Sequence, residues 1–157
     1  MARAGEAADR MPDRLVAHDT WAQEVYAMLR LTAALAAQLR GDSAGAADQA
    51  EEAARIAQVH GERPDAFEYF GPANVSTWLT MLAVKDGEPA QALEYAAAAD
   101  LGPLPRVRRA LLLLDVARAH HQLGQGHDRQ VITTCGRPRT WRRSGSTAPR
   151  GHATWSR

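Results

Sequence analysis

The 157-residue sequence is poor in cysteine, lysine and aromatic residues. Its single cysteine, Cys135, cannot form an internal disulfide, which excludes a small disulfide-stabilised fold. No apolar run approaches the roughly 18 residues that a membrane-spanning helix needs. The segment from Met1 to Thr20 also lacks the hydrophobic centre of a secretion signal. We therefore expect a cytoplasmic protein with no membrane partner.

Motifs for metal and phosphate binding are also missing. The sequence contains no HExxH, no paired CxxC, and no glycine followed by the Lys and Ser or Thr of a phosphate loop. His120 and His121 are adjacent, so on a helix they point about 100° apart and cannot both face one metal ion. We therefore predict that the chain is not an enzyme and has no catalytic residues, no metal site and no cofactor.

The sequence does contain a recurring helical pattern. Helix-like segments run into Gly41, Gly87 and Gly124, which are 46 and 37 residues apart, and an alanine-rich segment follows each of the first two. These intervals lie in the range of helix-hairpin repeats, whose units bury an apolar face only by stacking on their neighbours. The sequence predicts an all-α fold of α-hairpin repeats, a fragment of a right-handed α-solenoid.

In each unit, apolar residues recur at helical spacing and are expected to form the core. The first helix of the first unit has Val25, Met28, Leu29, Leu35, Ala36 and Leu39, and its return helix has Ala46, Ala50, Ala53 and Ala57. The second unit has Val75, Trp78, Leu79 and Leu82, then Ala92, Ala96 and Ala99. The third has Val107, Leu111, Leu114, Ala117, His120 and Leu123. Small side chains on the return helices allow two helix axes to approach closely.

The return helix of the third unit is not evident in the sequence. Residues 131–157 carry six arginines and no acidic residue, whereas residues 1–130 carry 13 basic and 18 acidic residues, a net charge of −5. One interpretation of residues 131–157 is a disordered basic tail. The other is a segment translated in a shifted reading frame, because a one-base shift in a GC-rich gene permits a string similar to the missing helix. We expect a flexible segment at 1–21, a repeat domain at 22–130 and this tail at 131–157.

Two strings within the repeats resemble a known family. They are Phe70, Gly71, Pro72, Asn74 and Val75 before one helix, and the run Leu112 to Ala119 in another. Together they look like the tetratricopeptide-like C-terminal region of actinomycete helix-turn-helix transcriptional regulators of the XRE class, over roughly residues 22–130. The resemblance implies a tetratricopeptide-like domain that senses a ligand or mediates self-association. Only about 20 residues precede the first repeat helix, so we expect DNA binding only through a domain absent from this chain.

Candidate binding residues lie where the first helices of the second and third units begin. Such helices line the concave face of a stacked array, where polar groups can bind a peptide or protein. We predict that Asn74, Trp78, Arg106 and Arg109 contact the partner, since arginine can bind a carboxylate with two hydrogen bonds. The simpler alternative is that Asn74 caps its helix, Trp78 belongs to the core and the arginines are solvated.

Three functions remain open. The favoured one is the non-catalytic sensor or self-association portion of a transcriptional regulator that lacks its helix-turn-helix domain. The second is a stand-alone adaptor of the tetratricopeptide type, and the third is a small nucleic-acid binder that uses the arginines and Trp141 of the tail. Two further expectations are that the rings of Phe67, Tyr69 and Phe70 are buried, and that the uncovered third stripe makes the chain self-associate or fray after about Ala110.

Overall fold

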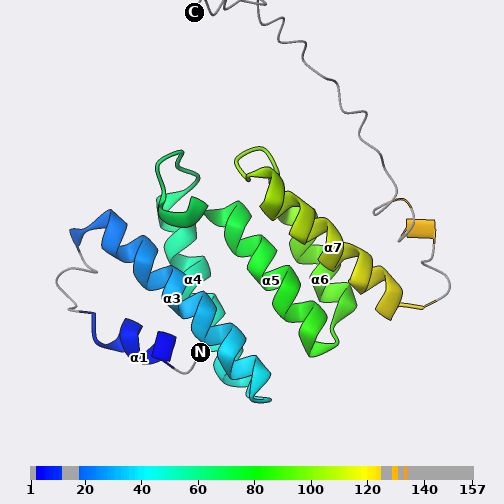
Figure 1. Ribbon diagram of the computed structural model, residues 1–157, viewed down its shortest axis with the longest axis horizontal. Helices are drawn as coiled ribbons and strands as arrows, with labels where there is room; N and C mark the ends of the chain where they lie inside the picture. Colours follow the sequence, from blue (N-terminus) through cyan, green and yellow to red (C-terminus); the bar gives the residue numbers. More distant parts are fainter. Residues whose placement is uncertain (1–2, 12–17, 125–128, 131–132, 134–157) are drawn as a thin grey trace, which may run out of the picture.

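The computed structural model describes residues 3–11, 18–124, 129–130 and 133, and the regular structure of these residues is helical throughout (Figure 1). The helices are α1 (Arg3–Asp9), α3 (Thr20–Leu39), α4 (Ser43–His60), α5 (Pro72–Asp86), α6 (Pro89–Ala98) and α7 (Arg106–Gln122), with a 3-10 turn, η1 (Phe67–Tyr69), before α5. The predicted all-α class is confirmed for this part of the chain.

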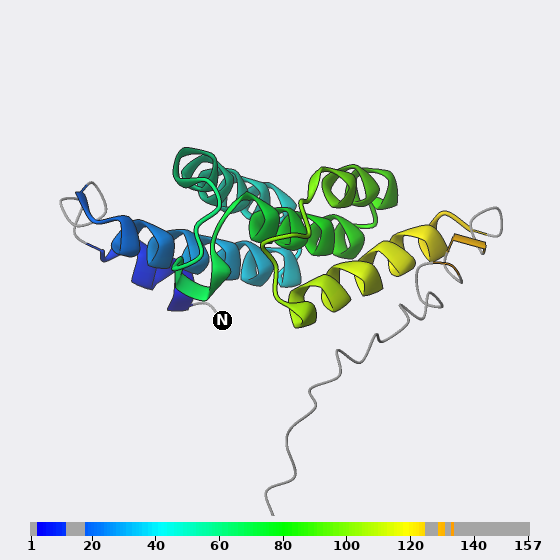
Figure 2. The ribbon, with the colours of Figure 1, turned by 90° about the horizontal axis from the view of Figure 1, so that it is seen from above.

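The long helices pack as successive pairs. α3 lies against α4 and α5 lies against α6, while α5 also contacts both members of the first pair. α7 in turn contacts both α5 and α6. Figure 2 shows the arrangement from above, with α4 and α6 toward one side of the molecule and α3 and α7 toward the other. Each pair is therefore followed by a helix that packs on both of its members.

A left-handed glycine begins the turn within each pair. Gly41 and Gly87 have φ angles of +80° and +78°, a region that glycine adopts at little cost. After Gly41, the Asp42 carboxylate accepts a hydrogen bond from the Gly45 amide (2.9 Å) and caps the start of α4. After Gly87, Pro89 occupies the first turn of α6, where its missing amide proton costs nothing. The helix ends predicted at these two glycines are confirmed.

Alanine forms much of the contact between α3 and α4. The alanines predicted to face inward from α4 are all buried: Ala46, Ala50, Ala53 and Ala57. On α3 the prediction was right for Ala36, which is buried, and wrong for Leu39, which is 60% exposed. The buried face also includes Ala27, Leu31 and Ala34. Both α1 and α4 pack on α3, and they approach it over its small residues. Met28 and Leu35 of the predicted stripe are half-buried and pack against core clusters.

α7 also packs through a different face from the one predicted. Its buried residues are Leu112, Asp115, Ala117 and Ala119, and Ala119 joins a core cluster with residues of α5 and α6. Of the predicted stripe, only Ala117 is buried, whereas Val107, Leu111, Leu114 and Leu123 are exposed. These side chains lie on the helix as predicted from their spacing, but most of them point away from the α5/α6 pair.

The segment before the first pair is more ordered than expected. The prediction of a flexible segment over residues 1–21 was wrong for residues 3–9, because they form α1 and pack on α3. Ala8 is 2% exposed in this contact. The carboxylate of Asp19 then caps α3 by accepting hydrogen bonds from the amides of Trp21 and Ala22. The predicted tail over residues 131–157 lies outside the described residues, apart from Thr133.

Candidate functional site

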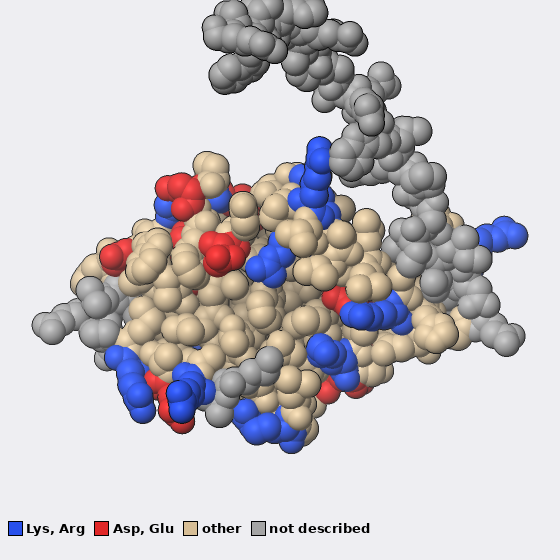
Figure 3. All heavy atoms as spheres, in the orientation of Figure 1, with Lys and Arg blue, Asp and Glu red and all other residues tan. Residues whose placement is uncertain are grey.

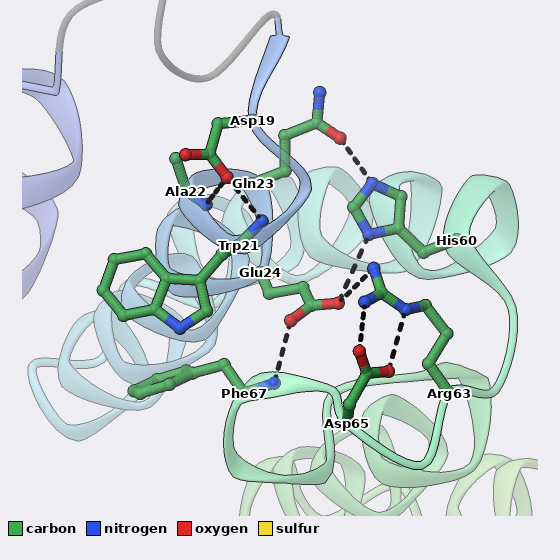
Figure 4. Close-up of polar contacts among 9 residues, drawn as sticks. All are labelled: Asp19, Trp21, Ala22, Gln23, Glu24, His60, Arg63, Asp65 and Phe67. Atoms are coloured by element: carbon green, nitrogen blue, oxygen red, sulfur yellow. Dashed lines mark hydrogen bonds and ion pairs between the residues drawn. The ribbon is translucent and has the colours of Figure 1, made fainter.

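A buried polar cluster joins the first helix pair to the loop before α5 (Figure 4). Glu24 of α3 is 1% exposed, and its Oε2 accepts a hydrogen bond from the Phe67 amide (2.8 Å). Its Oε1 lies 3.3 Å from Nη1 of Arg63 and 3.8 Å from Nδ1 of His60. Figure 4 shows these groups converging on the carboxylate from α3, from the end of α4 and from the following loop. The cluster holds three segments together that are distant in sequence.

His60 connects this cluster to the outer side of α3. Its Nε2 forms a hydrogen bond with Oε1 of Gln23. The separation of 3.8 Å between Nδ1 and Glu24 Oε1 is too long for a hydrogen bond, and neither atom has another hydrogen-bond partner although both are buried. The ring of His60 also meets Phe70 edge-on, with centroids 6.4 Å apart. The imidazole is therefore packed in the fold and is held in place from two sides.

Arg63 bridges the cluster to the surface. Its Nε and Nη2 donate hydrogen bonds to the two carboxylate oxygens of Asp65, at 3.3 and 3.0 Å. The hydrogen bonds from Arg63, followed by a backbone hydrogen bond within Asp65, lower the pKa of the Asp65 carboxyl. The same Asp65 hydrogen bonds raise the pKa of Arg63. The Arg63 guanidinium lies between the carboxylates of Glu24 and Asp65, so the arrangement stabilises the loop.

The aromatic loop is only partly buried. Phe70 is 1% exposed and belongs to the main core cluster, as predicted, while Phe67 packs edge-on against Trp21 with centroids 5.7 Å apart. The prediction was wrong for Tyr69, which is 53% exposed. Glu68 and Tyr69 both have left-handed backbones, with φ of 51° and 60°. This local strain turns the chain so that Phe70 enters the core and Tyr69 points outward.

Asn74 holds this loop in place from within. The residue is completely buried, and its Nδ2 donates a hydrogen bond to the Glu68 carbonyl (3.2 Å). Its Oδ1 lies 3.4 Å from the Thr77 hydroxyl, which donates mainly to the Asn74 carbonyl at 2.7 Å. Asn74 was predicted to contact a partner, but in this position it does not reach the surface. The amide instead satisfies a carbonyl of the strained turn.

The other three predicted binding residues lie one turn further along α5, for Trp78, and at the start of α7, for Arg106 and Arg109. Trp78 is half-buried against the main core cluster, and its Nε1 is buried without a hydrogen-bond acceptor. Arg109 donates from Nε to the Leu104 carbonyl (2.7 Å) and from Nη2 to the Gly102 carbonyl (2.8 Å), which secures the loop before α7. Arg106 lies exposed at the start of α7. Trp78 and Arg109 therefore have contacts within the fold, and partner binding by these residues stays a prediction.

The outer face of α7 carries several exposed apolar side chains. Five large apolar side chains of α7 and its C-cap are between 38% and 64% exposed: Val107, Leu111, Leu113, Leu114 and Leu123. Val107, Leu111 and Leu114 are spaced four and three residues apart, so they form one row along the helix. Neighbouring exposed apolar groups of this extent usually mark an interaction surface. We refer to the row of Val107, Leu111 and Leu114 as the α7 face.

One short string has the spacing of a catalytic motif but the wrong surroundings. Residues Gly41 to Gly45 match the G-x-S-x-G pattern of a nucleophile elbow, which requires a strand-to-helix turn. Here the string joins α3 to α4, and the Ser43 hydroxyl donates to Oδ1 of Asp86 (2.7 Å) rather than to a histidine. Among the described residues, no group of three or more His, Cys, Asp or Glu side chains is placed to hold a metal ion.

Comparison with known proteins adds no family assignment. No protein-family model matches the chain, and no curated protein or solved structure matches it. Of the helices described, none combines the length and the apolar character required to cross a membrane. The functional interpretation therefore depends on the geometry of the helices and their exposed surfaces.

Proposed function

We propose that the chain is a non-catalytic helical interaction domain that self-associates through the α7 face. The described helices are interpreted as tetratricopeptide-like repeats, with α3/α4 and α5/α6 as complete pairs and α7 as the first helix of a third. In such arrays each helix pair buries its apolar surface on the next one. The observation on which the proposal depends is that Val107, Leu111 and Leu114 remain exposed on the helix that follows the second pair.

A second copy of the chain is the partner that fits this face best. A two-fold axis across α7 places the apolar row of one copy against the same row of its partner, as an isologous interface requires. The two helices then run antiparallel about the centre of this row, so Arg106 and Arg108 of one copy lie opposite residues 113–115 of the other. The one carboxylate of α7, Asp115, is buried and already paired with Arg118 at 2.7 Å. The apolar row itself contains no charged residue, whereas the rest of α7 is basic.

In a regulator of the XRE class, to which the sequence has a resemblance, this domain would be the sensor or self-association portion. The nucleic-acid alternative depends on arginines in the tail, which lie outside the described residues. Over the face seen in Figure 3, basic and acidic side chains are interspersed, so no field of one sign covers it. Binding to nucleic acid generally requires a continuous basic surface. The described helices therefore favour self-association over the nucleic-acid alternative.

Analytical ultracentrifugation of the full chain tests this function. We expect the wild-type chain to sediment as a reversible dimer and the Leu111→Glu variant as a monomer, because a buried carboxylate at the centre of the interface is strongly unfavourable. Leu39→Glu is the matched control, since Leu39 is a similarly exposed leucine on α3, and it should leave the dimer intact. A folded wild-type chain that remains monomeric at all concentrations would contradict self-association and would favour the adaptor alternative.

A further inference from the structure

A cleft between α1, α3 and α4 has the composition of a small-molecule site. Its volume is about 460 Å³, within the range of ligand pockets. Met11, Tyr26, Ile56 and Val59 supply its apolar and aromatic lining. Val59 is 77% exposed at the edge of the cleft. The cleft lies at the opposite end of the molecule from α7 (Figure 1).

Arg30 supplies a cation in the wall of this cleft. Its side chain is 15% exposed and lies over the ring of Tyr26, with Cζ 4.8 Å from the ring centroid. Nη1 donates to Oε1 of Gln49 (2.9 Å) and Nη2 donates to Oδ1 of Asp9 (2.8 Å). Nε is buried and has no hydrogen-bond acceptor. The guanidinium is therefore fixed in orientation, but one of its donors is unsatisfied.

The Asp9 carboxylate occupies the position on Arg30 that the carboxylate of a ligand would take. Asp9 approaches from α1 with a side chain that is 65% exposed, and it engages the guanidinium through a single hydrogen bond. Arg30 is largely buried in this pair and Asp9 is largely exposed, so a competing anion that supplies the same charge can take the place of Asp9. A carboxylate is a suitable complement, because one of its oxygens can accept from Nη2 in the place that Asp9 occupies.

The remaining charges of the cleft do not compete for such an anion. Arg55 binds Glu52 through two hydrogen bonds, at 2.9 and 2.8 Å, so this pair is already neutralised. Those hydrogen bonds lower the pKa of the Glu52 carboxyl, and so Glu52 stays ionised at neutral pH. Once Asp9 is displaced toward solvent, Arg30 is the cation without a carboxylate partner. We propose that the cleft binds a small carboxylate with an apolar or aromatic body, anchored by Arg30 and covering Val59.

NMR titration of the full chain with benzoate tests this proposal, with benzamide as the neutral probe of the same shape. We expect benzoate to cause saturable shifts in the amide signals of Tyr26, Arg30 and Val59, and benzamide to bind at least about tenfold more weakly, because it lacks the charge. Equal binding of the two probes, or shifts that do not saturate, would overturn the proposal.

Two variants separate a binding role of Arg30 from a structural one. Arg30→Gln should weaken benzoate binding about tenfold or more, whereas Lys85→Gln, at an exposed position on α5, should leave it unchanged. Asp9→Asn retains Arg30 but removes the competing carboxylate, so it should tighten benzoate binding. Unchanged affinity in Arg30→Gln, or unchanged or weaker affinity in Asp9→Asn, would show that Arg30 is not the anchor. Because none of these changes touches the α7 face, the result is independent of self-association.

Discussion

Glu24 is a buried charged residue in a helix face that is otherwise apolar. The partners that compensate its charge, Arg63 and the Phe67 amide, come from about 40 residues further along the chain. No periodic pattern within α3 points to them, so the sequence predicted the helix but not the polar cluster. The cleft around Arg30 was missed for the same reason.

Replacing Glu24 should test the cluster. Glu24→Ala leaves the Phe67 amide and Arg63 without their buried acceptor, so we expect the free energy of unfolding to fall by about 3 kcal/mol. Urea unfolding followed by circular dichroism measures this change. Glu51→Ala, at an exposed position on α4, should change the free energy by less than about 0.5 kcal/mol. Similar values for the two variants would show that the cluster does not stabilise the fold.

Phe70 and Tyr69 are neighbours with opposite surroundings, which makes them a matched pair. Phe70→Ala creates a cavity in the main core cluster, so it should cost on the order of 3 kcal/mol of unfolding free energy. Tyr69→Ala removes an exposed ring and should cost less than about 1 kcal/mol. Thermal unfolding of both variants measures the difference. An unchanged melting temperature for Phe70→Ala would contradict the burial of its ring.

Acidification should weaken the fold through carboxyls that arginine stabilises in the ionised form. Hydrogen bonds from Arg55 lower the pKa of Glu52, against a smaller opposing effect of burial. A carboxyl with a lowered pKa in the folded state stabilises the protein above its unfolded pKa, and this contribution is lost as the pH falls through the folded value. We therefore expect the loss below about pH 4. In Arg55→Gln the NMR titration midpoint of Glu52 should rise, and a midpoint equal to that of the wild type would contradict the assignment.

At the scale of helices, turns were predictable and buried faces were less so. Gly41 and Gly87 define helix ends because a left-handed residue is needed there, which is a local requirement visible in sequence. The buried side of α7 was not predictable, because the leucine run from Leu111 to Leu114 places an apolar side chain on every side of the helix. Tertiary contacts with α5 and α6 select Leu112 and Ala119 for burial. The helix α1 was not predicted because it has only seven residues, too few to show a helical pattern in the sequence.

Two glutamines attach neighbouring helices to the end of α5. Gln38 of α3 donates to the Leu82 carbonyl (2.7 Å), and Gln122 of α7 donates to the Val84 carbonyl (2.9 Å). We expect Gln122→Ala to cost about 1 kcal/mol and to speed amide exchange in the last turn of α7. Gln58→Ala, at an exposed position on α4, is the control. Equal exchange rates in α7 for the two variants would show that Gln122 does not hold the helix end.

At the scale of the whole molecule, the described residues leave the side of α7 that faces away from α5 and α6 without a packing partner. α5 is covered by helices on both sides, from α3 and α4 and from α6 and α7. α7 is covered only by the α5/α6 pair, and its outer row is apolar. Burial of such a row in a dimer removes apolar surface from water, which favours association by about 25 cal/mol per Å². The order of the helices thus explains why the chain should bind a second copy.

Amide hydrogen exchange as a function of protein concentration tests this account most directly, because it locates the contact as well as detecting it. We predict that amides of α7 from Leu111 to Gln122 exchange more slowly as the concentration rises, while those of α4 do not change. In Leu111→Glu this concentration dependence should disappear. Exchange in α7 that is the same at all concentrations would contradict the claim that a second copy covers the α7 face.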